Sequence, residues 1–521
     1  MRLPTSLSID AHGPEDRASA TAAGIPDTWI IFAFLAIPSL LFYAFIGKPI
    51  LGAAFAVATL TAAPCFRLHA DRARTAANGY GAVLTMACAL AALALTTMGG
   101  EGRLVPATAD WLIRDAVLRD LVQQAWPFVY HADRKDWVLR APLGMYLIPA
   151  AIGKLAGLYG AHLALWLQNT LALCVVLRIF CNSASLARSV AVLVVFCIFS
   201  GWDVVGALAL AAGHSLASGA PLILPYDIEW WAGLFQYSST MTLVFWVPHH
   251  ALGGWLFTAL LLLWDRRRIR ISALMIGGAL AMFWSPFALM GAMPFLVKAG
   301  IEAIGQRRVA WSDVGVSVLL AIVLMPLVLY LTCAGGTVAS GFQPLTAGFL
   351  GRYTVFVALE VLPFAAINHR FGDARGGFSR STYAVAIASL VLIPFYKIGP
   401  SNDFVMRASI PALAILAVTT GHTACHALQT GGARILVIAL VLVLGSLTGL
   451  TEIREILAAR NNGISTCDLV QAWYQERPVN QWIGDSTYLT DQNNMPLLIR
   501  SDRPQVLSTG RTPARCVDQR L

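Results

Sequence analysis

Charge is scarce in this chain. Asp, Glu, Lys and Arg make up 12% of its 521 residues, hydrophobic residues make up 57%, and the mean hydropathy is +0.66. Soluble globular domains carry about 25% charged residues, roughly twice this share. The scarcity therefore excludes an ordinary soluble enzyme. It predicts an all-α polytopic protein whose solvent is mostly the lipid bilayer.

The chain also lacks the short motifs of several function classes. It has no Gly-rich P-loop, no HExxH pair and no nucleophile elbow, and its aromatic and cationic residues do not alternate as in nucleic-acid-binding surfaces. The net charge of +9 comes from short arginine clusters between apolar runs, which is the pattern of the positive-inside rule. We therefore expect a lipid bilayer, and no nucleic acid, as a partner. The predicted inside clusters are 67–74, 265–270, 305–308 and 369–380.

About thirteen apolar segments fit between these clusters, because the chain must cross an even number of times from one inside cluster to the next. The amino terminus then lies inside and the carboxyl terminus outside. The apolar segment 143–160 would put an arginine cluster on the wrong side if it crossed, so we place it along the outer membrane surface. The predicted spans are 28–48, 50–65, 79–97, 161–180, 188–207, 249–264, 270–285, 286–304, 315–333, 352–368, 383–396, 408–425 and 434–451.

This topology divides the chain into five parts. The first 26 residues are charged and contain no apolar core, so we do not expect a cleaved signal peptide. Cys467 and Cys516 fall in the last part, where an oxidising compartment would permit a disulfide. The parts are a cytoplasmic tail (1–27), a three-helix transmembrane segment (28–97), a periplasmic loop with juxtamembrane helices (98–160), a transmembrane bundle (161–451) and a periplasmic carboxyl-terminal segment (452–521).

The stretch ATADWLIRDAVLRDLVQQAWP (107–127) concentrates charge in the first outer loop. Its apolar residues recur at helical spacing, which predicts an amphipathic helix lying on the membrane. Asp110 stands at the start of this helix, where it is either an N-cap or a catalytic carboxylate. Asp115 and Asp120 are lesser candidates, which we expect to pair with neighbouring arginines on a solvated face, namely Arg114 and Arg119.

This loop resembles the first outer loop of the polytopic GT-C glycosyltransferases, the superfamily of protein mannosyltransferases and lipid A aminoarabinose transferases. The resemblance covers about fifty residues and rests on Asp110, Trp126 with Pro127, RAPLGMY (140–146) and KLAG (154–157), in this order. Three features depart from the family pattern. The acidic pair is a single Asp110, Arg140 replaces a lysine, and the loop follows the third span instead of the first.

The resemblance implies a GT-C-like bundle and an inverting transfer of a sugar from a polyprenyl-phosphate donor to a glycan or lipid acceptor. Asp110 would be the general base that accepts the proton of the attacking hydroxyl, and cations would hold the phosphate. The active site would face the periplasm or exterior of a bacterial inner membrane.

Further candidates for the substrate site lie at the predicted outer ends of other spans. Lys397, Asp403 and Arg407 occur in YKIGPSNDFVMRASIPAL (396–413), where Arg407 begins an outer helix that would suit a phosphate. The alternative is an arginine that reaches the interface or pairs with Asp403. His249 and His250 could donate to phosphate. A shared metal ion is not favoured, because neighbouring helical residues diverge, and no cofactor is expected.

Two acidic residues complete the predicted substrate site. Asp203 would orient sugar hydroxyls or pair with Arg140, and Glu229, near Asp227 and two tryptophans, suits carbohydrate stacking. Two other function classes stay open: a transporter or flippase of a lipid-linked glycan, and a surface-polysaccharide polymerase or ligase. Intramembrane acids are few, with Glu360 as the main candidate, whereas the charges gather on one outer face. That distribution favours chemistry at the outer face over transport.

Overall fold

The computed structural model describes residues 27–68, 80–225, 227–333, 338–372, 377–399, 402–458, 463–476, 488–509 and 516. Within these ranges, nine helices are long and apolar enough to cross a bilayer, or ten if the bent pair α13 and α14 is one span. The fold is thus that of an all-α, multi-pass membrane protein, as predicted. The predicted cytoplasmic tail lies outside the described residues except for Asp27.

Most of the described residues lie in α-helices. In chain order they are α1 (Asp27–Phe45), α2 (Pro49–Ala62), α3 (Gly81–Met98), α4 (Trp111–Gln123), α5 (Leu147–Cys181), α6 (Leu186–Ile198), α7 (Asp203–Ser218), α8 (Thr240–Trp246), α9 (Pro248–Asp265), α10 (Ile271–Ala281), α11 (Pro286–Gly305), α12 (Trp311–Thr332), α13 (Ala347–Glu360), α14 (Leu362–Phe371), α15 (Arg380–Leu392), α16 (Asp403–Ala408), α17 (Ile410–Thr430), α18 (Arg434–Ala458) and α19 (Leu469–Glu476). The 3-10 helices are η2 (Ala63–Phe66), η4 (Glu101–Arg103), η5 (Ile228–Ala232), η7 (Ile393–Phe395) and η9 (Gln492–Asn494).

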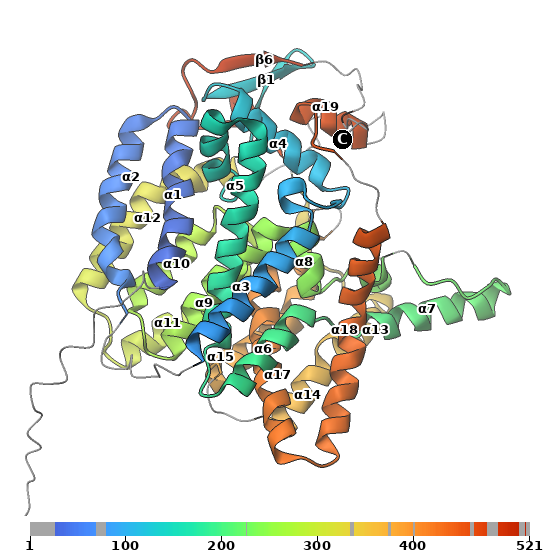
Figure 1. Cartoon of the computed structure of the whole chain (residues 1–521). Helices are drawn as coiled ribbons and strands as arrows, with labels where there is room; N and C mark the ends of the chain where they lie inside the picture. Colours follow the sequence, from blue (N-terminus) through green and yellow to red (C-terminus); the bar gives the residue numbers. More distant parts are fainter. Residues whose placement is uncertain are drawn as a thin grey trace, which may run out of the picture.

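The predicted count of thirteen spans is not confirmed, because several predicted segments form short or broken helices. A helix needs about 20 residues to cross the hydrocarbon core. Helix α10 has 11 residues and α15 has 13. The predicted span 352–368 is divided at Val361 into α13 and α14, which meet at 44°. The predicted span 188–207 is divided into α6 and α7, which together (Leu186–Ser218) make up one of the nine candidate spans; Figure 1 shows α7 projecting from the side of the bundle.

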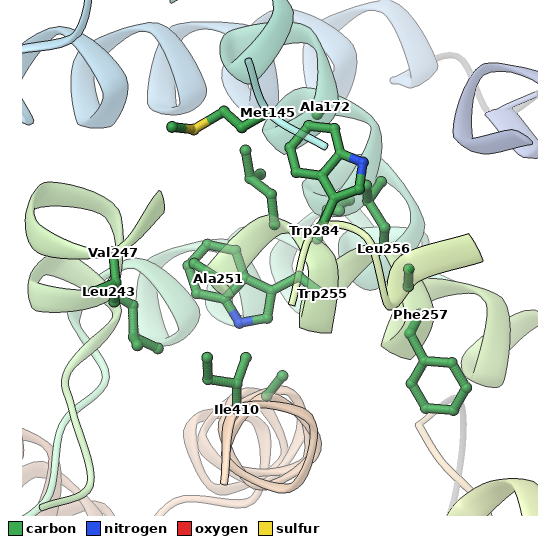
Figure 2. Packing of buried hydrophobic residues seen from close by; sticks show 14 of the residues in the cluster. Met145, Ala172, Leu243, Val247, Ala251, Trp255, Leu256, Phe257, Trp284 and Ile410 are labelled. Atoms are coloured by element: carbon green, nitrogen blue, oxygen red, sulfur yellow. The ribbon is translucent and has the colours of Figure 1, made fainter. Parts of the chain in front are cut away.

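Close packing in the centre of the bundle depends on small residues. In lipid, helix association relies on van der Waals contact more than on the hydrophobic effect. A Cβ atom on Gly253 would lie 2.8 Å from Cβ of Trp284, and one on Gly254 would lie 2.5 Å from Cγ2 of Ile410. Figure 2 shows Trp255 and Trp284 between Ile410 on one side and Met145 on the other. Gly253 and Gly254 therefore let α9 pack closely against Trp284 and Ile410.

Helix α5 runs from Leu147 to Cys181 and is sharply broken at Gly157. Gly157 has φ 76° and ψ 177° inside the helix, a conformation that a residue with a side chain rarely adopts. The residues before this break belong to the segment that we predicted to lie on the membrane surface. The residues after it contain the predicted span 161–180. The break at Gly157 therefore separates the predicted surface segment of α5 from its predicted membrane-spanning segment.

A small mixed cap covers one end of the bundle, where Figure 1 shows β1, β6, α4 and α19 together. Its sheet has the order β5-β2-β1-β6, with β1–β2 and β2–β5 antiparallel and β1–β6 parallel. The disulfide Cys467–Cys516 lies in the same carboxyl-terminal region, with Cα atoms 4.9 Å apart. The first outer loop and the carboxyl-terminal segment therefore form one unit, which the sequence did not predict. The strands are β1 (Phe128–Ala132), β2 (Lys135–Leu139), β5 (Leu489–Asp491) and β6 (Gln505–Ser508).

A second, two-stranded sheet precedes α16. Strand β3 (Ser340–Phe342) pairs antiparallel with β4 (Tyr396–Ile398), and the register places Gly341 opposite Lys397. Helix α16 begins shortly after β4 and packs against it. This two-stranded sheet therefore lies directly before the start of α16.

Candidate functional site

Helix α4 carries Asp110 at its N-cap position, but the carboxylate caps no backbone N–H. Oδ2 of Asp110 instead accepts from Nη2 of Arg114 at 3.1 Å, one helical turn away. The Asp110 side chain is 50% exposed, whereas that of Arg114 is 2% exposed. A buried guanidinium therefore orients a carboxylate that stays open to the outside. This arrangement suits a reacting group better than a helix cap.

The other two acids of α4 are buried, so the predicted solvated face is wrong. Asp115 pairs with Arg103, and its Oδ1 lies 3.9 Å from Nδ1 of His162. Asp120 accepts from the Tyr130 hydroxyl and from the Leu469 backbone N–H, each at 2.8 Å. Asp115 is covered by η4 and α5, whereas Asp120 is covered by the carboxyl-terminal segment and keeps its predicted pair with Arg119, with Nη1 3.0 Å from Oδ1. Both acids have structural partners and are not candidates for catalysis.

Two histidines open α9 beneath this helix. Pro248 begins α9, so His249 and His250 lie in its first turn. Their ring centroids are 3.9 Å apart, and Nδ1 of His250 lies 2.8 Å from the hydroxyl of Ser285. The ring of Tyr146, at the start of α5, lies 6.3 Å from that of His249. The two histidines are buried, so they face the protein interior.

Helix α16 brings the predicted outer arginine to the same place. Asn402 has φ 54°, a left-handed conformation that starts this short helix. Arg407 donates from Nη1 to the Asp403 carboxylate at 3.3 Å and lies 5.9 Å from the ring centroid of Phe287. Its side chain is 21% exposed. The predicted pairing with Asp403 is therefore present.

Electrostatic interactions show that these elements converge. The charges of Arg114 and Arg407 both act on His249. Burial raises the pKa of Tyr488, the guanidinium groups of Arg114 and Arg407 lower it, and the nearby carboxylates raise it. The charges of Arg114 and Tyr488 likewise act on Tyr146. We call this set the outer cluster. It comprises Asp110, Arg114, Tyr146, His249, His250, Asp403, Arg407 and Tyr488.

Several polar atoms of the outer cluster have no hydrogen-bond partner among the described residues. They are the Tyr146 hydroxyl, Nδ1 of His249, Nε and Nη1 of Arg114 and Nε of Arg407. A shielded polar group without a partner costs about 1–3 kcal/mol, so native proteins usually satisfy it with protein, water or ligand. The arginine N–H groups are donors, and the tyrosine hydroxyl is able to donate. This surplus of donors suits an anionic ligand such as a phosphate.

Three members of the outer cluster were missed or misplaced by sequence reasoning. Arg114 was assigned to a solvated pair with another acid. Tyr146 ends the RAPLGMY motif that carries the family resemblance, so a signal for it was present. Tyr488 lies in the carboxyl-terminal segment just before β5, where no periodicity or motif marks it. Its backbone carbonyl accepts from the N–H of Arg140 at 2.7 Å, which ties β2 to this residue.

Two predicted cations have other contacts. Arg140 donates from Nη1 to the backbone carbonyl of Leu331 at 2.9 Å, so it fastens the cap to the end of α12. It does not pair with Asp203. Lys397 is half-buried on β4, opposite Gly341. The structure therefore gives Arg140 an anchoring position and places Lys397 on β4, the strand that precedes α16.

Asp203 and Glu229 belong to a separate buried acidic group. Asp203 accepts from the hydroxyls of Ser200 at 2.7 Å and Thr448 at 2.9 Å, and it is hydrogen-bonded to Glu360. Burial raises the pKa of Glu229, and the charges of Asp203 and Glu452 raise it further. Glu229 accepts from three groups of its own loop and α8, namely Ser239 N–H, the Thr242 hydroxyl and the Gln236 amide. These acids satisfy local donors and do not join the outer cluster.

The outer cluster is thus assembled from α4, the start of α5, the start of α9, α16 and the residue before β5. It contains two carboxylates, of which Asp110 is half-exposed, two guanidinium groups, two tyrosines and two histidines. Comparison of the chain with protein family models, with curated proteins and with solved structures finds no match.

Proposed function

We propose that this protein is a membrane glycosyltransferase of the GT-C type. It transfers a sugar from a polyprenyl-phosphate donor to a glycan or lipid acceptor at the outer face of the cytoplasmic membrane. The observation that carries the proposal is the outer cluster, in which the half-exposed Asp110 carboxylate shares one site with Arg407 and unpartnered donors. An inverting transfer needs both devices, a proton acceptor and a cationic phosphate site.

The reaction is a single displacement at the anomeric carbon. The acceptor hydroxyl oxygen forms the new glycosidic bond while the bond from the anomeric carbon to the phosphate oxygen breaks. Asp110 takes the hydroxyl proton, and the phosphate leaves with the bonding electron pair. Arg407, Tyr146 and His249 stabilise the growing negative charge on the phosphate. Arg114 positions Asp110 through the 3.1 Å contact.

The packing below the cluster supports this chemistry. Trp255 and Trp284 are almost completely buried (Figure 2). Trp284 directly precedes Ser285, whose hydroxyl lies 2.8 Å from Nδ1 of His250, so these tryptophans form an apolar floor next to the buried histidines of the proposed site. Charge interactions are stronger where water is excluded. A phosphate held between this floor and Arg407 would therefore be bound more tightly than one on an open surface.

The test is sugar transfer from a radiolabelled polyprenyl-phosphate sugar pool by the purified full chain. Asp110→Asn should lose activity by about 10²- to 10⁴-fold, the usual value of general-base assistance. Asp136→Asn is the matched control, because Asp136 lies on the same cap with a side chain that is 40% exposed. Its activity should equal that of wild type.

The outcomes separate the function classes. Transfer by wild type and its loss only in Asp110→Asn would support a transferase with this base. Equal activity of both variants would move the base elsewhere. Movement of a lipid-linked glycan across vesicles without any transfer would instead identify a flippase, which should tolerate Asp110→Asn.

A further inference from the structure

A second site lies outside the outer cluster, at the start of α13. An open pocket of about 270 Å³ lies between the loop before α8, the link from β3 to α13 and the first turns of α13. Its walls include Leu234, Phe235, Gln343, Thr346, Phe349 and Arg352. No residue of the outer cluster lines it.

The polar side of this pocket consists of donors. Arg352 is exposed and makes no ion pair within the described part of the chain. Nε2 of Gln343 is shielded from solvent and has no hydrogen-bond partner there. The pocket also meets the amino-terminal end of α13, where Thr346 caps the helix by accepting from the Phe349 N–H at 3.2 Å. No acidic residue lines the pocket, so its charge complements an anion.

The surroundings of the pocket are apolar and open. Phe342, Leu345 and Leu350 are neighbours of lining residues in the chain, with 82%, 66% and 41% of their surface exposed. Large apolar side chains exposed together mark a surface that meets lipid or a ligand. An anion bound at Arg352 would therefore sit beside hydrocarbon. That combination describes the headgroup and the first chain segments of an anionic lipid.

We propose that this pocket binds a membrane lipid through a phosphate monoester headgroup, held by Arg352 and Gln343, with its chains along Phe342 and Leu345. The pocket also touches the outer cluster indirectly. Nδ2 of Asn402 donates to the backbone carbonyl of Leu234 at 2.6 Å, and Asn402 directly precedes Asp403. A lipid in the pocket would therefore contact Leu234, to which Asn402 at the start of α16 is hydrogen-bonded. The proposal concerns binding and does not depend on transferase activity.

Native mass spectrometry of the full chain in a neutral detergent tests the proposal, with dioctanoyl phosphatidic acid as the probe. Because the outer cluster would also bind a phosphate group, the measurement is made in an Arg407→Gln background. Arg352→Gln should weaken binding about tenfold or more, since it removes a charge-assisted hydrogen bond. Arg503→Gln, at an exposed arginine of the carboxyl-terminal segment, is the charge control.

A pair of glycine variants tests the location without changing charge. Cβ atoms on Gly348 and Gly351 would both meet nothing within 4 Å, yet only Gly348 lines the pocket. Gly348→Phe should fill the pocket and abolish binding, whereas Gly351→Phe on the same helix should bind like the parent. Equal binding by the two phenylalanine variants would overturn the assignment of the site.

Two further probes distinguish the source of the phosphate. Inorganic phosphate should bind at least about tenfold more weakly than phosphatidic acid, because it lacks the apolar contacts. Equal affinity would overturn the lipid assignment. Dioctanoyl phosphatidylcholine should not compete, and competition by it would show that the headgroup is not recognised. If Arg407→Gln alone leaves the lipid stoichiometry unchanged, the bound lipid occupies this pocket and not the outer cluster.

Discussion

Arg114 and Asp110 form an ion pair across one turn of α4, in which the arginine is buried and the aspartate is half-exposed. The difference in exposure matters because the buried guanidinium of Arg114 can orient the exposed carboxylate of Asp110. Arg114 also lies within electrostatic range of Tyr146 and Tyr488. The pair therefore connects the predicted base to the two tyrosines of the outer cluster.

We predict that Arg114→Gln lowers kcat for sugar transfer by about 10²-fold, since a misplaced catalytic group typically costs that much. The KM for the donor should change little, because Arg114 acts through Asp110. Arg114→Lys should recover part of kcat, since it keeps the charge but not the planar fork. Arg503→Gln serves as the folded control. A raised donor KM with unchanged kcat would instead assign Arg114 to the phosphate.

A pH dependence of stability follows from Asp120. Burial of this carboxyl raises its pKa from 3.8 to about 7, although donation by Leu469 and Tyr130 partly opposes the effect. Below pH 4 the group is protonated in both folded and unfolded chains, so its contribution to stability is fully present. As the pH rises towards 7, only the unfolded chain ionises, and this contribution is lost. Above pH 7 no further loss from this group is expected.

Thermal midpoints of wild type and Asp120→Asn at pH 4.5, 5.5, 6.5 and 7.5 measure this contribution. The difference between them should shift steadily in favour of Asp120→Asn as the pH rises, because asparagine does not titrate. Other buried acids affect both proteins equally and cancel in the difference. A difference that is constant across the four values would show that Asp120 titrates in its ordinary range.

Tyr488 offers a test of the carboxyl-terminal segment as part of the site. Tyr488→Phe removes only the hydroxyl and should reduce transfer about tenfold, the effect of one hydrogen bond to a charged group. Tyr474→Phe is matched to it, because the Tyr474 hydroxyl donates to Asp133 at 2.9 Å on the outer part of the cap. Thermal midpoints of both variants should equal that of wild type. If transfer falls equally in both, Tyr488 has only a structural role.

The sequence predicted the membrane-spanning class, and it singled out several residues of the outer cluster, for physical reasons that are local. Long apolar runs and arginine clusters mark spans and their ends, so Asp110, His249 and Arg407 were placed at outer ends before any contact was known. Their convergence was an inference from topology. The structure brings these three together, whereas Asp203 and Glu229 lie in a different group of acids.

The remaining features depend on long-range contacts that no local pattern encodes. Strands β5 and β6 are three and four residues long and pair with strands more than 350 positions earlier in the chain. Burial of Asp115 and Asp120 arises because other segments cover α4, and an amphipathic helix has the same sequence pattern whether its polar face meets water or protein. Tyr488 was missed for the same reason.

The last prediction concerns how α16 is held, because Arg407 depends on it. Gly291 of α11 lies against the end of α16, and a Cβ atom there would lie 1.8 Å from the backbone carbonyl oxygen of Ala408. Gly291→Ala must therefore push α16 away, at a typical cost of about 1–3 kcal/mol for overpacking. Gly300→Ala on the same helix is the control, since its Cβ would meet only the flexible end of Met275 at 3.5 Å. We expect Gly291→Ala to lower both the thermal midpoint and the affinity for the donor, and Gly300→Ala to change neither. Because the displaced residue is the neighbour of Arg407, a variant that loses stability but keeps donor affinity would separate α16 packing from phosphate binding and remove Arg407 from the site.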